Sequence, residues 1–242
     1  MANCLSVYLL GLVDFDSAAQ LQDRLVYELS GRDDTAGVLI LCGHPPTITI
    51  GREGRRQEIG ADEGDLRAHE IEIRWVSRGG GCFLHLPGQL SINLLIPLQR
   101  LHLGLQDYRL RLERAVQTAA AEFQVQLDRK ESTPGLFGRG GEVGFFGAAV
   151  KAGVTCHGIS LNVTTDGFLF RLAHIGQSTP GLPKPPIKVT SLEGIRAGTV
   201  TMNQVRESII RQICVEFNYE LQHIQTGHPL LKRTTHQATP VG

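Results

Sequence analysis

Apolar residues recur with helical spacing in three parts of the chain. In Ser17–Ser30 leucines fall on one face at every fourth position, Ser17 is placed to cap the start and Gly31 to end the helix. Segment 105–127 keeps the same spacing of apolar residues over a longer stretch. The third pattern starts at Thr201, where Gln204 completes a capping box. The sequence therefore predicts three amphipathic helices.

Runs with alternating or continuous apolar residues lie between these helices and are typical of β-strands. They are 37–42, 47–50, 70–77, 90–96, 142–150 and 153–163. Helices and strands do not alternate strictly, so we expect an α+β fold, a mixed sheet with helices packed on one face, rather than a doubly wound fold. The prolines of 178–191 exclude this segment from a helix and from a central strand and predict a loop.

The chain shows no linker, internal repeat or low-complexity tract. We therefore expect one domain over residues 1–220, followed by a C-terminal tail, 221–242, that has little periodicity and is partly disordered.

Composition narrows the class of protein. Apolar residues make up 41% of the 242 residues and charged residues 20%, as in ordinary globular proteins. Basic and acidic residues balance at 24 each, which argues against a nucleic-acid or membrane-surface partner. The start of the chain has no basic leader, and no apolar run approaches the ~20 residues of a membrane span. The five cysteines are scattered without zinc-ligand spacing, so we expect a reducing, cytoplasmic setting and no metal.

The stretch RGGGCFLHLPGQL, residues 78–90, is the first candidate for chemistry. Glycines after a strand offer backbone N–H groups to an anion or a carbonyl oxygen, and Arg78 and His85 add side-chain donors. The same composition also suits a glycine-rich hairpin with a structural histidine. No helix opens after the glycines, so the stretch is not a dinucleotide fingerprint, and it lacks the ending of a Walker loop.

Two further stretches carry polar groups among apolar ones. In GVTCHGISLNV, Cys156 and His157 are neighbours on a predicted strand and should point to opposite faces, which places them poorly as a nucleophile–base pair. His157 either reaches into a cleft or is a structural histidine. In CGHPPTITIGR, Arg52 either reaches an anionic ligand or is solvated at a strand end.

Taken together, HPPTITIGR, RGGGCFLHLPGQL and GVTCHGISLNV…KVTSL resemble, in order and spacing, the octanoyltransferases of lipoate synthesis, part of the biotin/lipoate protein ligase superfamily. The resemblance runs from about Leu5 to about Tyr219. It implies the mixed sheet flanked by helices of that group. It also implies a cofactor-independent acyltransferase that moves an octanoyl group from acyl carrier protein to a lysine in the lipoyl domain of a 2-oxoacid dehydrogenase, or in the glycine cleavage protein.

The resemblance further implies an acyl pocket between the motifs, where glycines let the backbone approach the acyl chain and N–H groups hold a developing oxyanion. The residues that it places along this pocket are Arg78, Gly79, Gly80, Gly81, Cys82, Phe83, Leu84, His85, Phe145, Phe146, Gly147, Gly158, Ile159 and Ser160.

The chain departs from the family at two positions that the resemblance makes catalytic. Gly176 stands where the family has its acyl-accepting cysteine, and Glu142 stands where it has the lysine that activates this cysteine. A cation near a thiol favours the thiolate, whereas a carboxylate disfavours it. Both changes therefore point away from a covalent acyl-enzyme.

Three interpretations follow from these departures. The chain is a transferase in which the acceptor lysine attacks the thioester directly, with Lys151, Lys184 or Lys188 replacing the lost cation, or Cys82 the lost thiol. Alternatively, it is a non-catalytic homologue, a pseudoenzyme that binds acyl groups or lipoyl domains. The third interpretation is an adenylate-forming ligase that uses Lys151 or Lys188.

Overall fold

The structure is a computed structural model that describes residues 3–130, 133–165, 167–173 and 188–231. Its centre is an eight-stranded sheet in which β1 pairs in parallel with β11 and β2, and the other neighbours pair antiparallel. The strands, in the order of the sheet, are β11 (Tyr219–Thr226), β1 (Asn3–Leu12), β2 (Gly37–Gly43), β6 (Gln89–Leu95), β10 (Val154–Asn162), β9 (Gly141–Lys151), β8 (Thr133–Gly138) and β7 (Asp128–Lys130).

A second, three-stranded sheet contains residues 82–85 of the glycine-rich stretch 78–90. Its order is β4 (Glu72–Trp75), β3 (Thr47–Ile50) and β5 (Cys82–His85). The long helices are α1 (Phe15–Ser30), α3 (Leu105–Ala121) and α6 (Met202–Phe217). Shorter elements are α2 (Glu63–Ala68), α4 (Phe168–Ala173), α5 (Leu192–Arg196) and a 3-10 turn, Arg56–Glu58.

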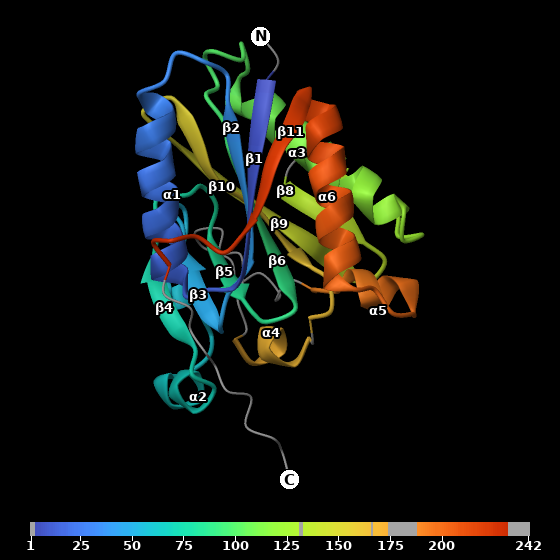
Figure 1. Ribbon diagram of the computed structural model, residues 1–242. Helices are drawn as coiled ribbons and strands as arrows, with labels where there is room; N and C mark the ends of the chain where they lie inside the picture. Colours follow the sequence, from blue (N-terminus) through green and yellow to red (C-terminus); the bar gives the residue numbers. More distant parts are fainter. Residues whose placement is uncertain (1–2, 131–132, 166, 174–187, 232–242) are drawn as a thin grey trace.

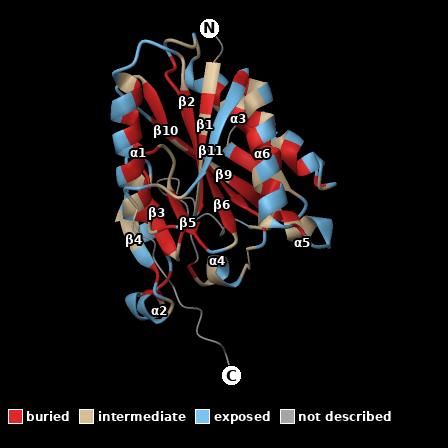
Figure 2. Cartoon of the chain, in the orientation of Figure 1, coloured by how far each residue is buried: buried red, intermediate tan, exposed pale blue. Residues whose placement is uncertain are grey.

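Helices cover both faces of the large sheet, because successive strand residues point to opposite faces. In β2, Leu39 and Leu41 pack with residues of α3 and α6, whereas Ile40 and Cys42 pack with the leucines of α1. Figures 1 and 2 show α1 on one side of the buried strands and α6 on the other. The α+β class is confirmed, and the expectation that helices lie on one face only is wrong.

The helix boundaries follow from capping side chains. α1 begins two residues before the predicted Ser17, because the carboxylate of Asp14 accepts a hydrogen bond from the backbone N–H of Ser17 and caps the helix. The third predicted helix is confirmed at its cap, where Thr201 Oγ1 accepts from the N–H of Gln204. The Asp14 cap was missed because Ser17 is an equally good capping residue by type.

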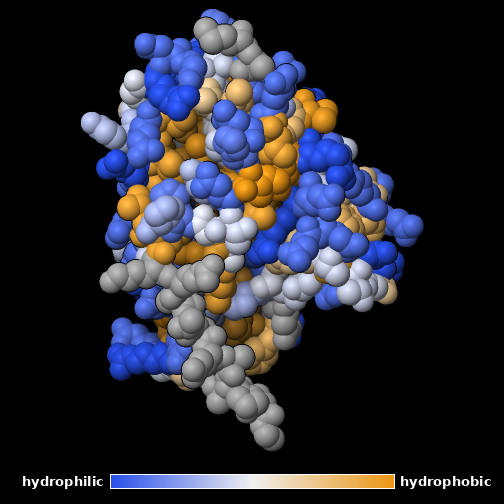
Figure 3. Space-filling model, in the orientation of Figure 1, coloured by the Kyte–Doolittle hydropathy of each residue, from blue (hydrophilic) through white to orange (hydrophobic). Residues whose placement is uncertain are grey.

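Five strands were not predicted: β1, β5, β7, β8 and β11. The expected domain end at residue 220 falls inside β11, which pairs with β1 as far as Leu9 opposite Thr226. Residues 221–226 therefore belong to the sheet. β11 lacks periodicity because it is an edge strand, exposed along most of its length. Apolar side chains gather over β1 and β11 in Figure 3. Leu221 and Ile224 of β11 are about half exposed.

Within the described ranges, no helix combines the length and the apolar character that crossing a bilayer requires.

Candidate active site

The floor of the candidate site is a row of buried polar side chains in the middle of the large sheet. Along β6 the even-numbered residues are apolar and face α3 and α6, whereas Ser91 and Asn93 face the opposite side, toward α1. The register of β10 places Ser160 opposite Ser91 and Gly158 opposite Asn93. Polar groups therefore lie where the centre of a sheet is ordinarily apolar.

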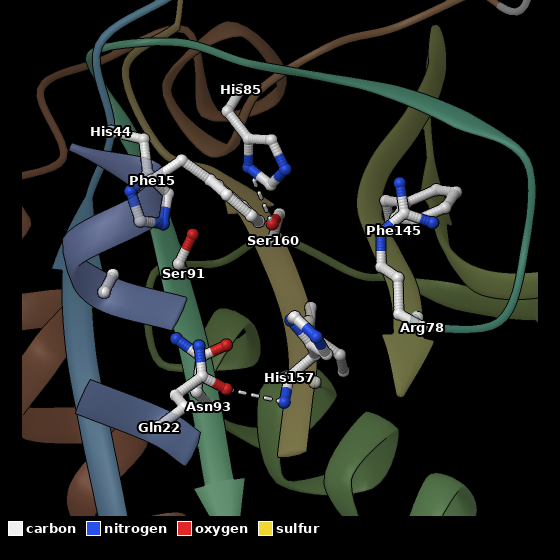
Figure 4. A pocket seen from close by; sticks show the side chains of 14 residues that line it. Phe15, Gln22, His44, Arg78, His85, Ser91, Asn93, Phe145, His157 and Ser160 are labelled. Carbon is white, nitrogen blue, oxygen red and sulfur yellow. Dashed lines mark hydrogen bonds between the residues drawn. The ribbon is translucent and has the colours of Figure 1, made fainter. Parts of the chain in front are cut away.

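A cavity of about 20 Å³ lies over this row, which is room for about one water molecule. Phe15 and His44 lie on one side of it and Arg78 and Phe145 on the other (Figure 4). The residues that line it are Phe15, Ala18, Gln22, His44, Arg78, His85, Ser91, Asn93, Phe145, Gly147, His157, Gly158, Ile159 and Ser160.

Arg78 forms a buried clamp between the glycine stretch and β3. Its Nη1 donates to the carbonyls of Gly79 and Gly81, at 2.9 and 3.1 Å. Its Nη2 donates to the carbonyl and the hydroxyl of Thr49, at 3.0 and 2.7 Å. Burial lowers the pKa of Arg78 to about 10, which still leaves the side chain charged at neutral pH. Arg78 therefore contributes a fixed positive charge to the cavity wall.

The tautomer of His85 follows from this clamp. Thr49 Oγ1 accepts from Arg78, and its own hydrogen has two acceptors, the carbonyl of Phe83 at 3.5 Å and Nε2 of His85 at 3.1 Å, of which the shorter contact favours Nε2. Nδ1 of His85 then carries the proton and lies 3.5 Å from Ser160 Oγ, at the limit of a hydrogen bond. Burial, together with the neighbouring His44 and Arg78, keeps the pKa of His85 well below its ordinary value. His85 is therefore a neutral imidazole whose N–H is only weakly held.

His44 is a second neutral imidazole in the wall. Its Nδ1 donates to the carbonyl of Val13 at 2.9 Å, which makes Nε2 an acceptor, 3.7 Å from the thiol of Cys42. Burial lowers the pKa of His44 and raises that of Cys42 to about 12, so the thiol stays protonated. The His44 and His85 rings meet edge to face, with centroids 5.3 Å apart.

His157 is held by its backbone rather than by its ring. Its φ of 61° is left-handed, and its N–H donates to Oε1 of Gln22 on α1 at 2.8 Å. Burial lowers the pKa of the imidazole to about 4. The left-handed residue interrupts the alternation of side chains along β10. Cys156 and His157 therefore both line a second hollow, beside α1. The prediction that they point to opposite faces is therefore wrong.

Phe145 fills the space that two glycines leave open. Its ring stacks on Phe83, with centroids 4.3 Å apart, and lies 4.9 Å from the guanidinium carbon of Arg78. A Cβ on Gly147 would meet the ring at 3.2 Å and Arg78 Cδ at 2.9 Å, and one on Gly80 would meet the ring at 3.2 Å. The glycines are therefore required for this ring to sit against the backbone.

A second hollow, of about 190 Å³, adjoins the cavity through Gln22 and His157. Lys151 lines it and pairs with Asp23 of α1 at 2.5 Å. The exposed Trp75 lies at the same hollow. Lys151 is thus neutralised by a carboxylate and lies outside the cavity itself.

The structure brings eight of the expected residues together around the cavity. They are Arg78, His85, Phe145, Gly147, His157, Gly158, Ile159 and Ser160. The others of the expected set do not line it: Gly79, Gly80, Gly81, Cys82, Phe83, Leu84 and Phe146. Cys82 and Leu84 point into the core under the small sheet, and Phe146 packs against the α3 side of the large sheet. Successive side chains of a strand point to opposite faces of the sheet, so these three side chains point away from the cavity that His85 of β5 and Phe145 of β9 line.

The expectation of free glycine N–H groups is wrong for two of the three positions. The N–H of Gly79 donates to the carbonyl of Ala148 at 2.9 Å, and that of Gly80 donates to the carboxylate of Glu53 at 3.2 Å. These two groups hold the glycine stretch in place.

Cys82 is unsuited to replace the family's nucleophile. Its thiol donates to the carbonyl of Arg55 at 3.3 Å, and burial raises its pKa to about 11. Among the described residues that line the cavity there is no cysteine. Across the same part of the chain, no three histidine, cysteine or carboxylate side chains are grouped to hold a metal ion.

Glu142 is buried on β9, where its backbone pairs with residues 188–190. Its Oε1 has no hydrogen-bond partner among the described residues, and burial raises the pKa of the carboxyl to about 8. Lys188 contacts Glu142 through its backbone, because the carbonyl oxygen of Lys188 accepts a hydrogen bond from the backbone N–H of Glu142. Gly176 and Lys184 lie outside the described residues.

Six lining residues were not expected from the sequence: Phe15, Ala18, Gln22, His44, Ser91 and Asn93. For β6 a signal was available, because QLSINLL alternates polar and apolar residues although both faces of the strand are buried. The three residues of α1 carried no signal, because nothing in the sequence indicates which sheet face this helix covers.

Known proteins resemble this chain over most of its length. The family model of the lipoyl protein ligase A/B catalytic domain matches residues 14–214. An octanoyltransferase from Geotalea uraniireducens is 36% identical over 201 residues, which cover 83% of this chain and 87% of that protein. An octanoyltransferase from Nitratidesulfovibrio vulgaris is 33% identical over 212 residues, 87% of this chain and 93% of that protein.

Solved structures share the fold at lower identity. A bi-partite lipoate protein ligase from Thermoplasma acidophilum, studied with its E2 lipoyl domain, has a TM-score of 0.70 at 16% identity, over 95% of this chain and 89% of that chain. A lipoate-protein ligase A bound with ATP has a TM-score of 0.70 at 15% identity, over 95% and 91% of the two chains. These likenesses confirm the fold of the biotin/lipoate ligase group.

Proposed function

Because the chain belongs to the family of the lipoyl protein ligase A/B catalytic domain, and within it to the octanoyltransferases, we propose that it transfers an octanoyl group to a lysine of a lipoyl domain. The observation that carries the proposal is 36% identity to an octanoyltransferase across 83% of the chain. Relatives named octanoyltransferase favour this function over the non-catalytic alternative. We propose an octanoyl-loaded acyl carrier protein as the donor, and lipoyl domains of 2-oxoacid dehydrogenases or the glycine cleavage protein as acceptors.

The proposed reaction is a direct aminolysis of the donor thioester. The neutral amine of the acceptor lysine attacks the carbonyl carbon, the C–N bond forms and the C–S bond breaks. The proton that the amine loses goes to the departing thiolate of the donor. Direct attack is supported by the cavity wall, since no cysteine of the described residues lines it. The protein then accelerates the reaction by holding the two substrates together.

Two groups of the wall suit the charge that develops in this reaction. Arg78 is the only permanently charged side chain among the described residues that line the cavity. Its positive charge, and the weakly held Nδ1–H of His85, stabilise negative charge on the thioester oxygen. Because His85 is neutral, it acts here as a hydrogen-bond donor rather than as a base.

The test is a reaction of the purified chain with octanoyl-acyl carrier protein and a lipoyl domain, without ATP. We expect the lipoyl domain to gain the mass of one octanoyl group on its acceptor lysine. His85→Gln should slow this transfer, whereas His228→Gln, a change outside the cavity, should leave it unchanged. Mass gain no greater than in a reaction without the protein would refute the proposal.

A further inference from the structure

The hollow beside the cavity reaches the surface of the molecule. It holds about 190 Å³, against about 20 Å³ in the cavity. Trp75, at the end of β4, lines it and is 68% exposed, and the exposed Asp23 of α1 lines it as well. A side chain of another protein can therefore enter the hollow, whereas the cavity has room for about one water molecule.

The hollow already binds one lysine ammonium. Nζ of Lys151 pairs with Oδ1 of Asp23 at 2.5 Å, and Asp23 is the only carboxylate among the described residues that line the hollow. The two side chains are 39% and 57% exposed, and an ion pair in such surroundings contributes little to stability. An incoming lysine carries the same ammonium group, so it can replace Lys151 at Asp23 with little loss of free energy.

Two residues connect the hollow with the cavity. Gln22 and His157 line both spaces, and the backbone N–H of His157 donates to Oε1 of Gln22 (Figure 4). The His157 ring makes no hydrogen bond to any described residue, and burial keeps it neutral by lowering its pKa to about 4. An amine at Asp23 is therefore separated from the cavity by two uncharged side chains, which do not repel it.

We propose that this hollow is the entrance for the acceptor lysine, whose ammonium binds Asp23 in exchange for Lys151 while its methylene stem lies on the indole of Trp75. This inference rests on the proposed function, since it assigns the acceptor of that reaction to one side of the site. The fixed positive charge of Arg78 in the cavity beyond lowers the pKa of an approaching ammonium. The lysine therefore loses a proton to water in the open hollow and enters the cavity as the neutral amine.

Binding of a lipoyl domain to the purified chain tests the inference without depending on transfer. Trp75 is the single tryptophan of the chain, so its fluorescence reports on the hollow when the chosen lipoyl domain has no tryptophan. We expect the domain to shift the emission of Trp75. We also expect it to bind about three- to fivefold more tightly than the same domain with methionine in place of its acceptor lysine. Asp23→Asn should remove this difference, because the charge that recognises the ammonium is gone.

Lys151→Met distinguishes an exchange of lysines from a merely structural ion pair. Removing Lys151 frees the carboxylate of Asp23, so this variant should bind the lipoyl domain more tightly than the unaltered chain, whereas Asp23→Asn should bind it more weakly. A structural ion pair predicts only a loss of stability in both variants, which thermal unfolding measures. Glu28→Gln is the matched control, because Glu28 pairs with Arg24 on the same helix outside the hollow. It should leave the affinity for both domains unchanged.

Two results of the binding experiment overturn the inference: Asp23→Asn that weakens both domains equally, or Lys151→Met that binds the lipoyl domain no more tightly than the unaltered chain. In steady-state transfer, a KM of Asp23→Asn raised for octanoyl-acyl carrier protein and not for the lipoyl domain would assign the hollow to the donor and overturn it as well. Octanoyl transfer without the predicted dependence on Asp23 rejects the inference alone. The predicted dependence without any transfer rejects the proposed function and leaves the inference standing.

Discussion

Replacing Phe145 with alanine should open the cavity to an acyl chain. The ring occupies the space between Gly80 and Gly147, and the cavity beside it holds about 20 Å³. For an octanoyl chain to enter, the ring must leave its stack on Phe83 and its contact with Arg78. Phe145→Ala removes that requirement, so the variant should bind octanoate more tightly than the unaltered chain.

The size of both effects follows from the packing of the ring. A fully buried phenylalanine removes roughly 150–250 Å² from water, which is worth about 4–6 kcal/mol at about 25 cal/mol per Å². Phe145 is partly buried, so its loss should lower the free energy of unfolding by about 2–3 kcal/mol and the melting temperature by roughly 4–12 °C. In the variant, an incoming octanoate no longer has to break the stacking and cation–π contacts of the ring. These contacts are together worth about 1–3 kcal/mol, which corresponds to roughly five- to 150-fold in the affinity for octanoate.

The assay is thermal unfolding with and without octanoate, followed by titration calorimetry. Octanoate at a hundred times its Kd should return about 2.7 kcal/mol to the variant and so restore most of the lost stability. Phe146→Ala is the control, because Phe146 is the neighbour on β9 that packs against the α3 side of the sheet. It should lose stability without gaining affinity. Octanoate binding by Phe145→Ala that is no tighter than binding by Phe146→Ala would show that the Phe145 ring does not obstruct the acyl chain.

Three further predictions concern the buried titratable groups. Cys82→Ser should transfer octanoyl groups at the rate of the unaltered chain, because the thiol faces the core under the small sheet; loss of transfer would assign Cys82 a catalytic role. The pKa of Glu142 is raised to about 8, so the folded state binds a proton that the unfolded state has released above pH ~4.5, and stability should fall by about 1.4 kcal/mol per pH unit between pH ~4.5 and ~8. Glu142→Gln should remove this slope in urea unfolding, and an unchanged slope would place its origin elsewhere. The pKa of His157 is lowered to about 4, so its contribution to stability is present above pH ~6.5 and is lost as the pH falls toward ~4. His157→Asn, which tolerates the left-handed backbone, should flatten the acid limb of the stability curve.

The sequence predicted most of the fold because its strongest signals are local. Periodicity and capping residues located the three long helices, and apolar runs located β2, β3, β6, β9 and β10. The missed strands lack such signals. β5 lies within the glycine stretch, and β11 is an exposed edge that is held by pairing with β1. Pairing between residues more than 200 positions apart leaves no mark in the local pattern.

The site was predictable only in part, because motifs specify positions along the chain and not directions in space. Alternation along β5 turns Cys82 and Leu84 into the small sheet's core while leaving His85 at the cavity. The left-handed backbone at His157 has the opposite effect and brings two neighbours to one hollow. Gln22 and Phe15 enter the site only because α1 crosses the polar row of β6 and β10.

We propose that this chain transfers an octanoyl group directly to a lipoyl domain, without an acyl-enzyme intermediate. Intact mass spectrometry of both proteins during a single reaction with octanoyl-acyl carrier protein tests it most directly. We predict that the lipoyl domain gains one octanoyl group on its lysine while the mass of the chain itself stays unchanged. An octanoyl adduct on the chain that precedes transfer would contradict the direct route, and a lipoyl domain of unchanged mass would contradict the function.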